Sequence, residues 1–234
     1  MTRESSRPDL PKCLTTLRKF YGSQIPVVLR DPLQIVLHEN VGYLADDTKR
    51  DAAFQRLRQE IGLDCEAILS ADPEKLIEIC RQGGIHAELR AERIRRIAAM
   101  VSNSFSGNLP AVFDLPTPQA RKELKKFPSI GEPGVDKILL LCGKQAVLAL
   151  DSNGLRVLTR LGYGEEQKSY SSTYKSAQTA VAQGHKLTME QLVDAYALLR
   201  LHGQKVCRRS APRCDSCPLT QWCTYYHNSR KMRG

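Results

Sequence analysis

The chain of 234 residues has no long apolar segment. No hydrophobic run approaches the roughly 18 to 20 residues that cross a bilayer, and 26% of the residues are charged. The first twelve residues, MTRESSRPDLPK, lack the apolar core of a secretion signal. These absences argue against a membrane protein and favour a cytoplasmic one. In that compartment cysteines are more often metal ligands or core residues than disulfides.

The sequence also lacks period-two alternation of apolar and polar residues, internal repeats and low-complexity tracts. Nearly every segment carries helical signals instead. Asp72 and Pro73 suit an N-cap and a first helical turn, and Gly83–Gly84 ends that segment. Thr188 and Gln191 form the pattern of a capping box. The sequence predicts an all-α protein of about ten helices, folded as one core or as two small lobes that share a cleft.

The net charge and the spacing of the histidines exclude few classes of function. The formal net charge is +10 and the pI is about 9.3. A polyanionic partner and an ordinary surface excess both explain these values, so charge alone does not decide for nucleic acid. The histidines show no metal-binding spacing; they are His38, His86, His185, His202 and His227.

The eight cysteines fall into two groups. Four stand at scattered apolar helix positions, where buried free thiols are expected: Cys13, Cys65, Cys80 and Cys142. The other four follow the spacing C-x6-C-x2-C-x5-C: Cys207, Cys214, Cys217 and Cys223. Three arginines lie among them: Arg208, Arg209 and Arg213. Four sulfurs in one short run require an explanation of their own.

A helical hairpin is predicted at residues 124–143, LKKFPSIGEPGVDKILLLCG. We expect a helix to end at Phe127, where Pro128 blocks its continuation, and a second helix to begin at about Gly134 after the flexible Gly131. Free backbone N–H groups at the start of the second helix suit a phosphate oxygen. An ordinary tight connection between helices explains the same residues.

Asp151 stands just ahead of the amphipathic segment GLRVLTRLG, a position typical of an N-cap. The order of hairpin, aspartate, GLRVLTRLG, LHG and cysteine run resembles the helix-hairpin-helix DNA glycosylases of the endonuclease III superfamily. The resemblance extends from about residue 28 to 223.

The resemblance implies a two-lobed fold with a DNA-binding cleft between the lobes. Residues 1–29 would form an N-terminal helix that packs with the cluster domain. Residues 30–146 would form a six-helix barrel domain containing the hairpin, and residues 147–234 the iron-sulfur cluster domain.

In this family the four cysteines hold a [4Fe-4S] cluster, and thiolates are the ligands that such clusters use. Zinc is the alternative. Structural zinc sites usually have two separated C-x2-C pairs, and this run has one, which favours the cluster. The expected role of the cluster is to fold its domain and hold the three arginines towards DNA phosphates.

The resemblance implies that Asp151 is the catalytic aspartate, which stabilises positive charge on the sugar or activates water. Bifunctional members carry a nucleophilic lysine after the hairpin, and Pro133 stands there in this chain. Lys137, about one turn on, is expected as a phosphate contact or a solvated side chain. A lyase reaction through Lys137 is the alternative.

Glu39, in DPLQIVLHENVGYLADD, matches the glutamate that protonates the departing base in the MutY-like adenine glycosylase branch. An apolar cleft would let Glu39 keep its proton near neutral pH. A solvent-facing glutamate on an amphipathic helix is the alternative.

Further DNA contacts follow from the resemblance. Tyr43 or Leu44 is expected to wedge into the base stack, unless both simply pack. His86 is expected as a surface or base-stack contact. Ser129, at the first hairpin glycine of the family, is grouped with Gly131 and Gly134 as phosphate contacts.

The predicted activity is that of a monofunctional DNA glycosylase that acts as a monomer on double-stranded DNA containing a damaged or mismatched base. The alternatives are a glycosylase with lyase activity and a non-catalytic DNA-structure binder. Because the chain ends shortly after the cysteine run, 8-oxoguanine recognition through an extra C-terminal domain is not expected.

Overall fold

The computed structural model describes residues 8–25, 28–43 and 45–231 of the chain. These residues form twelve α-helices and four short 3-10 helices, with no strand among them. The prediction of an all-α protein is therefore confirmed. Leu44, one of the two predicted wedge residues, lies outside the described residues. None of the helices in these ranges combines the length and the apolar character needed to cross a membrane.

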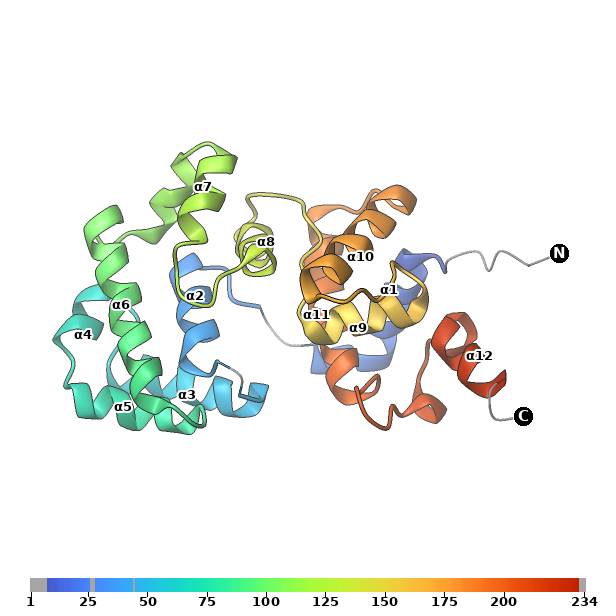
Figure 1. Cartoon of the computed structure of the whole chain (residues 1–234), viewed down its shortest axis with the longest axis horizontal. Coiled ribbons are helices and arrows are strands. Elements are labelled where there is room, and N and C mark those ends of the chain that lie inside the picture. Colours follow the sequence, from blue (N-terminus) through green and yellow to red (C-terminus); the bar gives the residue numbers. More distant parts are fainter. Residues whose placement is uncertain (1–7, 26–27, 44, 232–234) are drawn as a thin grey trace. The chain divides into compact units, whose positions relative to one another are not determined.

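The chain divides into two compact units (Figure 1). The central unit comprises Leu29–Lys144, and the terminal unit combines Met1–Val28 with Gln145–Gly234. The terminal unit therefore contains the segments next to both chain ends.

In the central unit, α6 forms the centre of the packing. The helices of this unit are α2 (Pro32–Val41), α3 (Asp47–Glu60), α4 (Cys65–Ser70), α5 (Pro73–Gln82), α6 (Ala87–Phe105), the 3-10 helix η2 (Leu109–Asp114), α7 (Thr117–Leu124) and α8 (Glu132–Leu141). Helix α6 packs against α2, α4 and α5 (Figure 1). Its apolar stripe of Ile94, Ile97 and Val101 is fully buried.

An aspartate cap positions α2. The Asp31 side chain accepts a hydrogen bond from the Gln34 backbone N–H at 2.8 Å, and Pro32 occupies the first turn. The helix ends at Val41, so its last turn carries Glu39 and Asn40.

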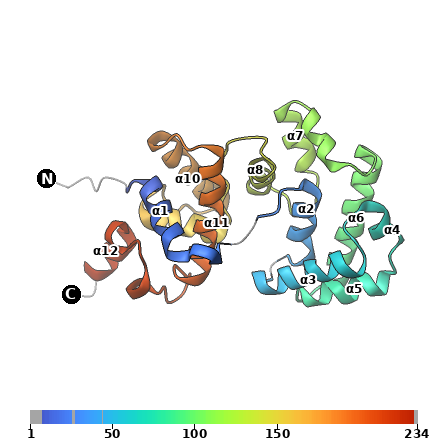
Figure 2. The same cartoon turned by 180° about the vertical axis from the view of Figure 1, so that it is seen from behind.

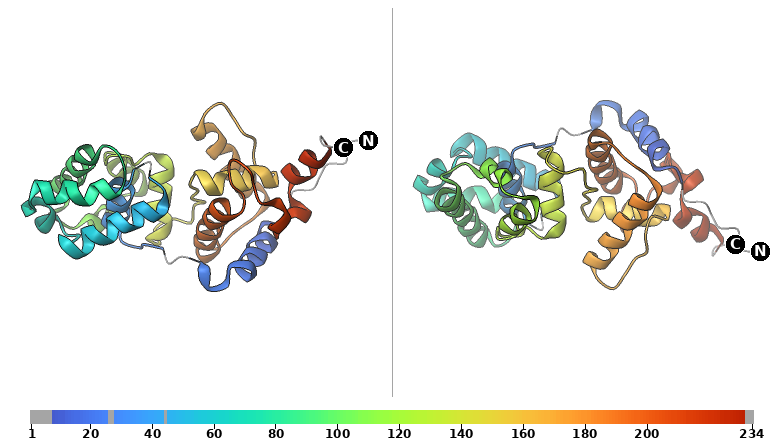
Figure 3. Two further views of the ribbon diagram at one scale, coloured as in Figure 1. Left: turned by 90° about the horizontal axis from the view of Figure 1, so that it is seen from below. Right: turned by 90° about the horizontal axis from the view of Figure 1, so that it is seen from above.

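In the terminal unit, α9 and α11 form the main packed pair. The helices are α1 (Leu10–Tyr21), η1 (Gly22–Gln24), α9 (Ser152–Leu161), α10 (Tyr170–Gly184), α11 (Met189–Lys205), η3 (Cys214–Ser216), η4 (Thr220–Trp222) and α12 (Thr224–Lys231). Helix α11 also packs against α1, as seen from behind in Figure 2. Both views of Figure 3 show α9 (yellow) beside α11 (brown).

Gly203 permits this close approach of α11 to the start of α9. A Cβ atom at Gly203 would lie 2.6 Å from the backbone oxygen of Asn153, so a larger residue requires the backbone of α9 to shift.

We expect Gly203→Ala to lower the free energy of unfolding by about 1–3 kcal/mol, the usual cost of overpacking. Urea unfolding followed by circular dichroism measures it. Gly184→Ala is the matched control, because its Cβ would meet nothing within 4 Å. Equal stabilities of the two variants would contradict the close-packing explanation.

Candidate functional site

The central unit contains a half-buried ion pair between two residues that the sequence analysis singled out. Lys137 Nζ of α8 lies 2.6 Å from Glu39 Oε1 of α2. The Lys137 side chain is 13% exposed and that of Glu39 27%. Lys137 is therefore not a solvated surface group, and Glu39 does not simply face solvent.

The ion pair determines the protonation of Glu39. Burial raises the pKa of this carboxyl, but the charges of Lys137 and Arg50 and the hydrogen bond from Lys137 outweigh burial and lower the pKa to about 2. The prediction that Glu39 keeps its proton near neutral pH is therefore wrong for the free protein. The basic partner, Lys137, is 98 positions further along the chain on α8, so the segment around Glu39 alone did not indicate it.

Two neighbours of Glu39 fix the last turns of α2. His38 is buried and its Nε2 lies 2.7 Å from Asp51 Oδ1 of α3. Asn40 is fully buried, and its Nδ2 donates to the Pro128 carbonyl in the hairpin at 2.9 Å. Asn40, which the sequence analysis did not single out, ties the helix of Glu39 to the hairpin.

The hairpin differs in its bounds from the prediction. Helix α7 ends at Leu124 rather than Phe127, and α8 begins at Glu132 rather than at about Gly134. Pro133 is tolerated in the first turn because the N–H that it lacks would have no partner within the helix. Glu132 Oε2 also accepts a hydrogen bond from Arg121 Nη2 at 2.6 Å, which holds the start of α8 against α7.

The turn of the hairpin is exposed. Ser129 has φ +61°, the left-handed conformation that glycine adopts most readily, so the serine keeps a glycine-like turn. A Cβ atom at Gly131 would approach nothing closer than Pro133 Cδ at 3.9 Å, which leaves open space over this turn. Gly134 packs on Ile130 instead, with the nearest atom of Ile130 3.3 Å from the site of a Cβ.

A pocket of about 490 Å³ in the central unit has exposed apolar side chains at its edge. Tyr43 is 40% exposed and Ile85 is 77% exposed, and both line it. The guanidinium of Arg93 lies 5.2 Å from the Tyr43 ring centroid. His86 also lines the pocket and is exposed.

Ile85 was missed by the sequence analysis. The available signal was an apolar residue directly after Gly83–Gly84 in a connection that should be polar. A Cβ atom at Gly83 would lie 2.4 Å from the Val41 backbone oxygen, so this glycine brings the connection against the end of α2, next to Tyr43.

Asp151 is the N-cap of α9 in the terminal unit. Its Oδ1 accepts a hydrogen bond from the Gly154 N–H at 2.7 Å, which confirms the predicted cap. Its Oδ2 accepts from Asn153 Nδ2 at 3.1 Å and lies 3.3 Å from Arg200 Nε. The side chain is 28% exposed, so one part of the carboxylate is fixed while another is accessible.

The four cysteines of the C-terminal run line one pocket, together with Val206 and Pro212. All four are thiols rather than disulfides in the structure. Burial, and then the charges of the other three sulfurs, raise the pKa of Cys217 to about 11, although a backbone hydrogen bond opposes the rise. Ionising Cys217 beside the other three sulfurs is therefore favoured by nearby positive charge, which an iron centre would supply. The donor set fits a thiolate-bound cluster.

Within the described ranges, no three Cys, His, Asp or Glu side chains are arranged to hold a metal ion.

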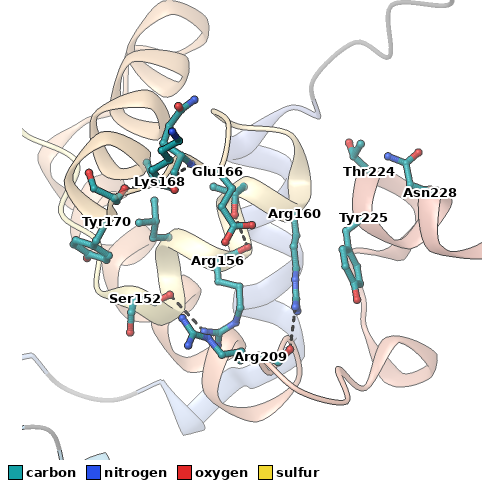
Figure 4. A pocket seen from close by; sticks show the side chains of 15 residues that line it. Ser152, Arg156, Arg160, Glu166, Lys168, Tyr170, Arg209, Thr224, Tyr225 and Asn228 are labelled. Atoms are coloured by element: carbon teal, nitrogen blue, oxygen red, sulfur yellow. Dashed lines mark hydrogen bonds between the residues drawn. The ribbon is translucent and has the colours of Figure 1, made fainter.

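Two arginines of α9 clamp the cysteine run. Arg156 Nε donates to the Cys207 carbonyl at 2.9 Å, and Arg160 Nη1 donates to the Arg208 carbonyl at 2.8 Å. Arg160 Nη2 also donates to the Arg209 carbonyl at 3.2 Å (Figure 4). Arg209 lines the adjoining polar pocket of about 580 Å³. The three arginines of the run (Arg208, Arg209 and Arg213) are exposed, as a contact to phosphates requires.

Comparisons with known proteins agree with one another. A model of the HhH-GPD superfamily of base excision DNA repair proteins matches residues 47–183. The chain is 24% identical to an endonuclease III of Sulfolobus acidocaldarius, covering 92% of this chain and 91% of that protein. It is 29% identical to a thymine-DNA glycosylase of Aeropyrum pernix, over 70% of this chain and 69% of that protein. The fold is similar to that of endonuclease III in a non-covalent DNA complex, with a TM-score of 0.73, 21% identity, and coverage of 96% and 97%.

Proposed function

The chain belongs to the HhH-GPD superfamily of base excision DNA repair proteins, and from this membership we propose that it is a monofunctional DNA glycosylase. It binds double-stranded DNA as a monomer, flips out a damaged or mismatched base, and hydrolyses the N-glycosidic bond. The product is an intact abasic site.

The ion pair of Glu39 with Lys137 is the observation that best supports a glycosylase without lyase activity. A lyase needs a neutral amine that attacks the sugar C1′. Pro133 has none, and the amine of Lys137 lies 2.6 Å from a carboxylate, which favours the ammonium.

The same pair supports a revised role for Glu39. Because the pKa of Glu39 is about 2, the proton available near the departing base is on the Lys137 ammonium. The Lys137 ammonium donates a charged hydrogen bond to the leaving base and keeps its proton, and Glu39 orients the ammonium. Glu39 is then a positioning residue rather than the acid.

Asp151 acts on the sugar. As the base leaves, positive charge develops at C1′, and a carboxylate held by the Gly154 N–H and beside Arg200 stabilises that charge or directs the attacking water. The partial exposure of Asp151 supports this role, since a reacting sugar must reach the carboxylate.

The exposed side chains of Tyr43 and Ile85 suit the space that a flipped nucleotide leaves, because apolar wedges fill such gaps in a base stack. Leu44 stays a prediction as the alternative wedge residue. The open turn at Ser129 and Gly131 and the exposed arginines suit phosphate contacts on the DNA backbone.

We also propose that the four cysteines hold a [4Fe-4S] cluster. The cluster would supply the positive charge that four neighbouring thiolates need, and so fold the loop that carries Arg208, Arg209 and Arg213. Arg156 and Arg160 hold that loop to α9 and therefore near Asp151 at the start of the same helix.

A panel of duplexes, each with one damaged or mismatched base, tests the activity. We expect at least one base to be released, strand breakage only after alkali, and no covalent complex on borohydride treatment. A trapped complex that disappears in Lys137→Met would show a lyase. Tight binding without release of any base in the panel would show a non-catalytic binder.

A further inference from the structure

His202 lies between a buried tyrosine and one of the four cysteines. It belongs to α11 and is 1% exposed. Its Nδ1 lies 2.9 Å from Tyr21 Oη of α1, and its Nε2 lies 3.4 Å from Cys217 Sγ. Tyr21 is itself 4% exposed, so the contact between its hydroxyl and the imidazole is shielded from water.

The order of the three groups determines which atom donates. A cysteine sulfur bound to iron is a thiolate, which accepts hydrogen bonds and donates none. Nε2 must therefore carry the imidazole proton towards Cys217. A neutral imidazole then has a lone pair on Nδ1, and the Tyr21 hydroxyl donates to it. The thiolate thereby selects the tautomer, and Tyr21 holds the imidazole in the orientation that points an N–H at the sulfur.

Cys217 differs in this respect from the neighbouring ligand. Cys207 Sγ lies 3.3 Å from Nη1 of Arg160 on α9, and the same guanidinium donates to the carbonyls of Arg208 and Arg209. The hydrogen bond to Cys217 comes instead from a neutral, fully buried donor. Neither solvent nor bound DNA phosphate can replace it.

We propose that His202, oriented by Tyr21, donates a hydrogen bond to the Cys217 thiolate and raises the reduction potential of the bound cluster. The reduced cluster carries one more negative charge, and an N–H directed at a ligand sulfur stabilises the reduced form more than the oxidised form. This role rests on the proposed cluster and is separate from base excision. His202 and Tyr21 are positioning residues for the ligand sphere.

Protein-film voltammetry of the purified full-length protein tests the proposal, with iron and acid-labile sulfide measured on each sample. His202→Phe should retain four irons and shift the midpoint potential to a lower value. His202→Gln places an amide N–H near the position of Nε2 and should restore most of the potential. Tyr21→Phe keeps the imidazole but removes the hydroxyl that holds its orientation, so a smaller shift in the same direction is expected.

An unchanged potential in both His202→Phe and Tyr21→Phe would overturn the proposal, as would a native protein that holds zinc and no iron. If His202→Phe does not load iron, Tyr21→Phe decides the question, because it removes a single hydroxyl. Base excision by the native protein is measured on the lesion panel in parallel. Potential shifts in the two variants, together with a native protein that releases no base, would show that the proposed activity fails while this inference holds.

Discussion

Replacing Asp151 by Asn is expected to lower the rate of base excision by about 10³-fold, about 4 kcal/mol of transition-state stabilisation, with little change in DNA affinity. The reason is that the charge on Asp151 matters chiefly when the sugar becomes positive. An asparagine oxygen still accepts from the Gly154 N–H and caps α9, because Asn and Asp are similar N-caps. Single-turnover excision and a binding titration on the same lesion duplex measure the two effects separately.

Asp72→Asn is the matched control. Asp72 caps α5 through the Glu74 N–H at 3.0 Å, so this variant makes the same chemical change at a cap remote in sequence from the proposed chemistry. It should excise at the native rate. Native excision by Asp151→Asn, with a native unfolding curve, would remove Asp151 from the mechanism.

The second large effect is expected at the ion pair. Lys137→Met should slow excision by about 10² to 10⁴-fold, the range that general-acid groups contribute. Glu39→Gln keeps a hydrogen-bond acceptor for the ammonium and should slow excision less. Lys175→Met, an exposed lysine of α10, controls for loss of one positive charge. A native rate for Lys137→Met together with an inactive Glu39→Gln would assign the proton to Glu39 instead.

The pH dependence distinguishes the same two mechanisms. The pKa of Glu39 is about 2 in the folded protein, against an ordinary value of 4.5. The ionised pair therefore stabilises the fold fully above about pH 4.5, and this contribution is lost as the pH falls through about 2. Native protein and Glu39→Gln should differ in unfolding free energy at pH 7 and converge towards pH 2. If Glu39 were a general acid with a pKa near neutrality, excision would accelerate between pH 8 and pH 5. We expect no such acceleration.

Local chemistry made part of the structure predictable. The caps at Asp72, Asp151 and Thr188 each close through a hydrogen bond to a backbone N–H two or three residues on, so short stretches of sequence contain both partners. The hairpin bounds were predicted less well. The expected start at about Gly134 overlooked that a helix accepts proline in its first turn, as Pro133 shows.

The sequence by itself determined the all-α class, the caps that begin the helices, and the run of four cysteines, because each depends on residues close together in the chain. Only the tertiary structure decided the state of Glu39, whose partner Lys137 is 98 positions away, and the contact of Tyr21 with His202, separated by 181. It also decided that Ile85 stands exposed beside Tyr43, through a glycine that lets two helix ends meet. The pKa of a carboxyl and the tautomer of an imidazole depend on the charges and donors within a few ångströms, and packing brings those groups together from distant parts of the sequence.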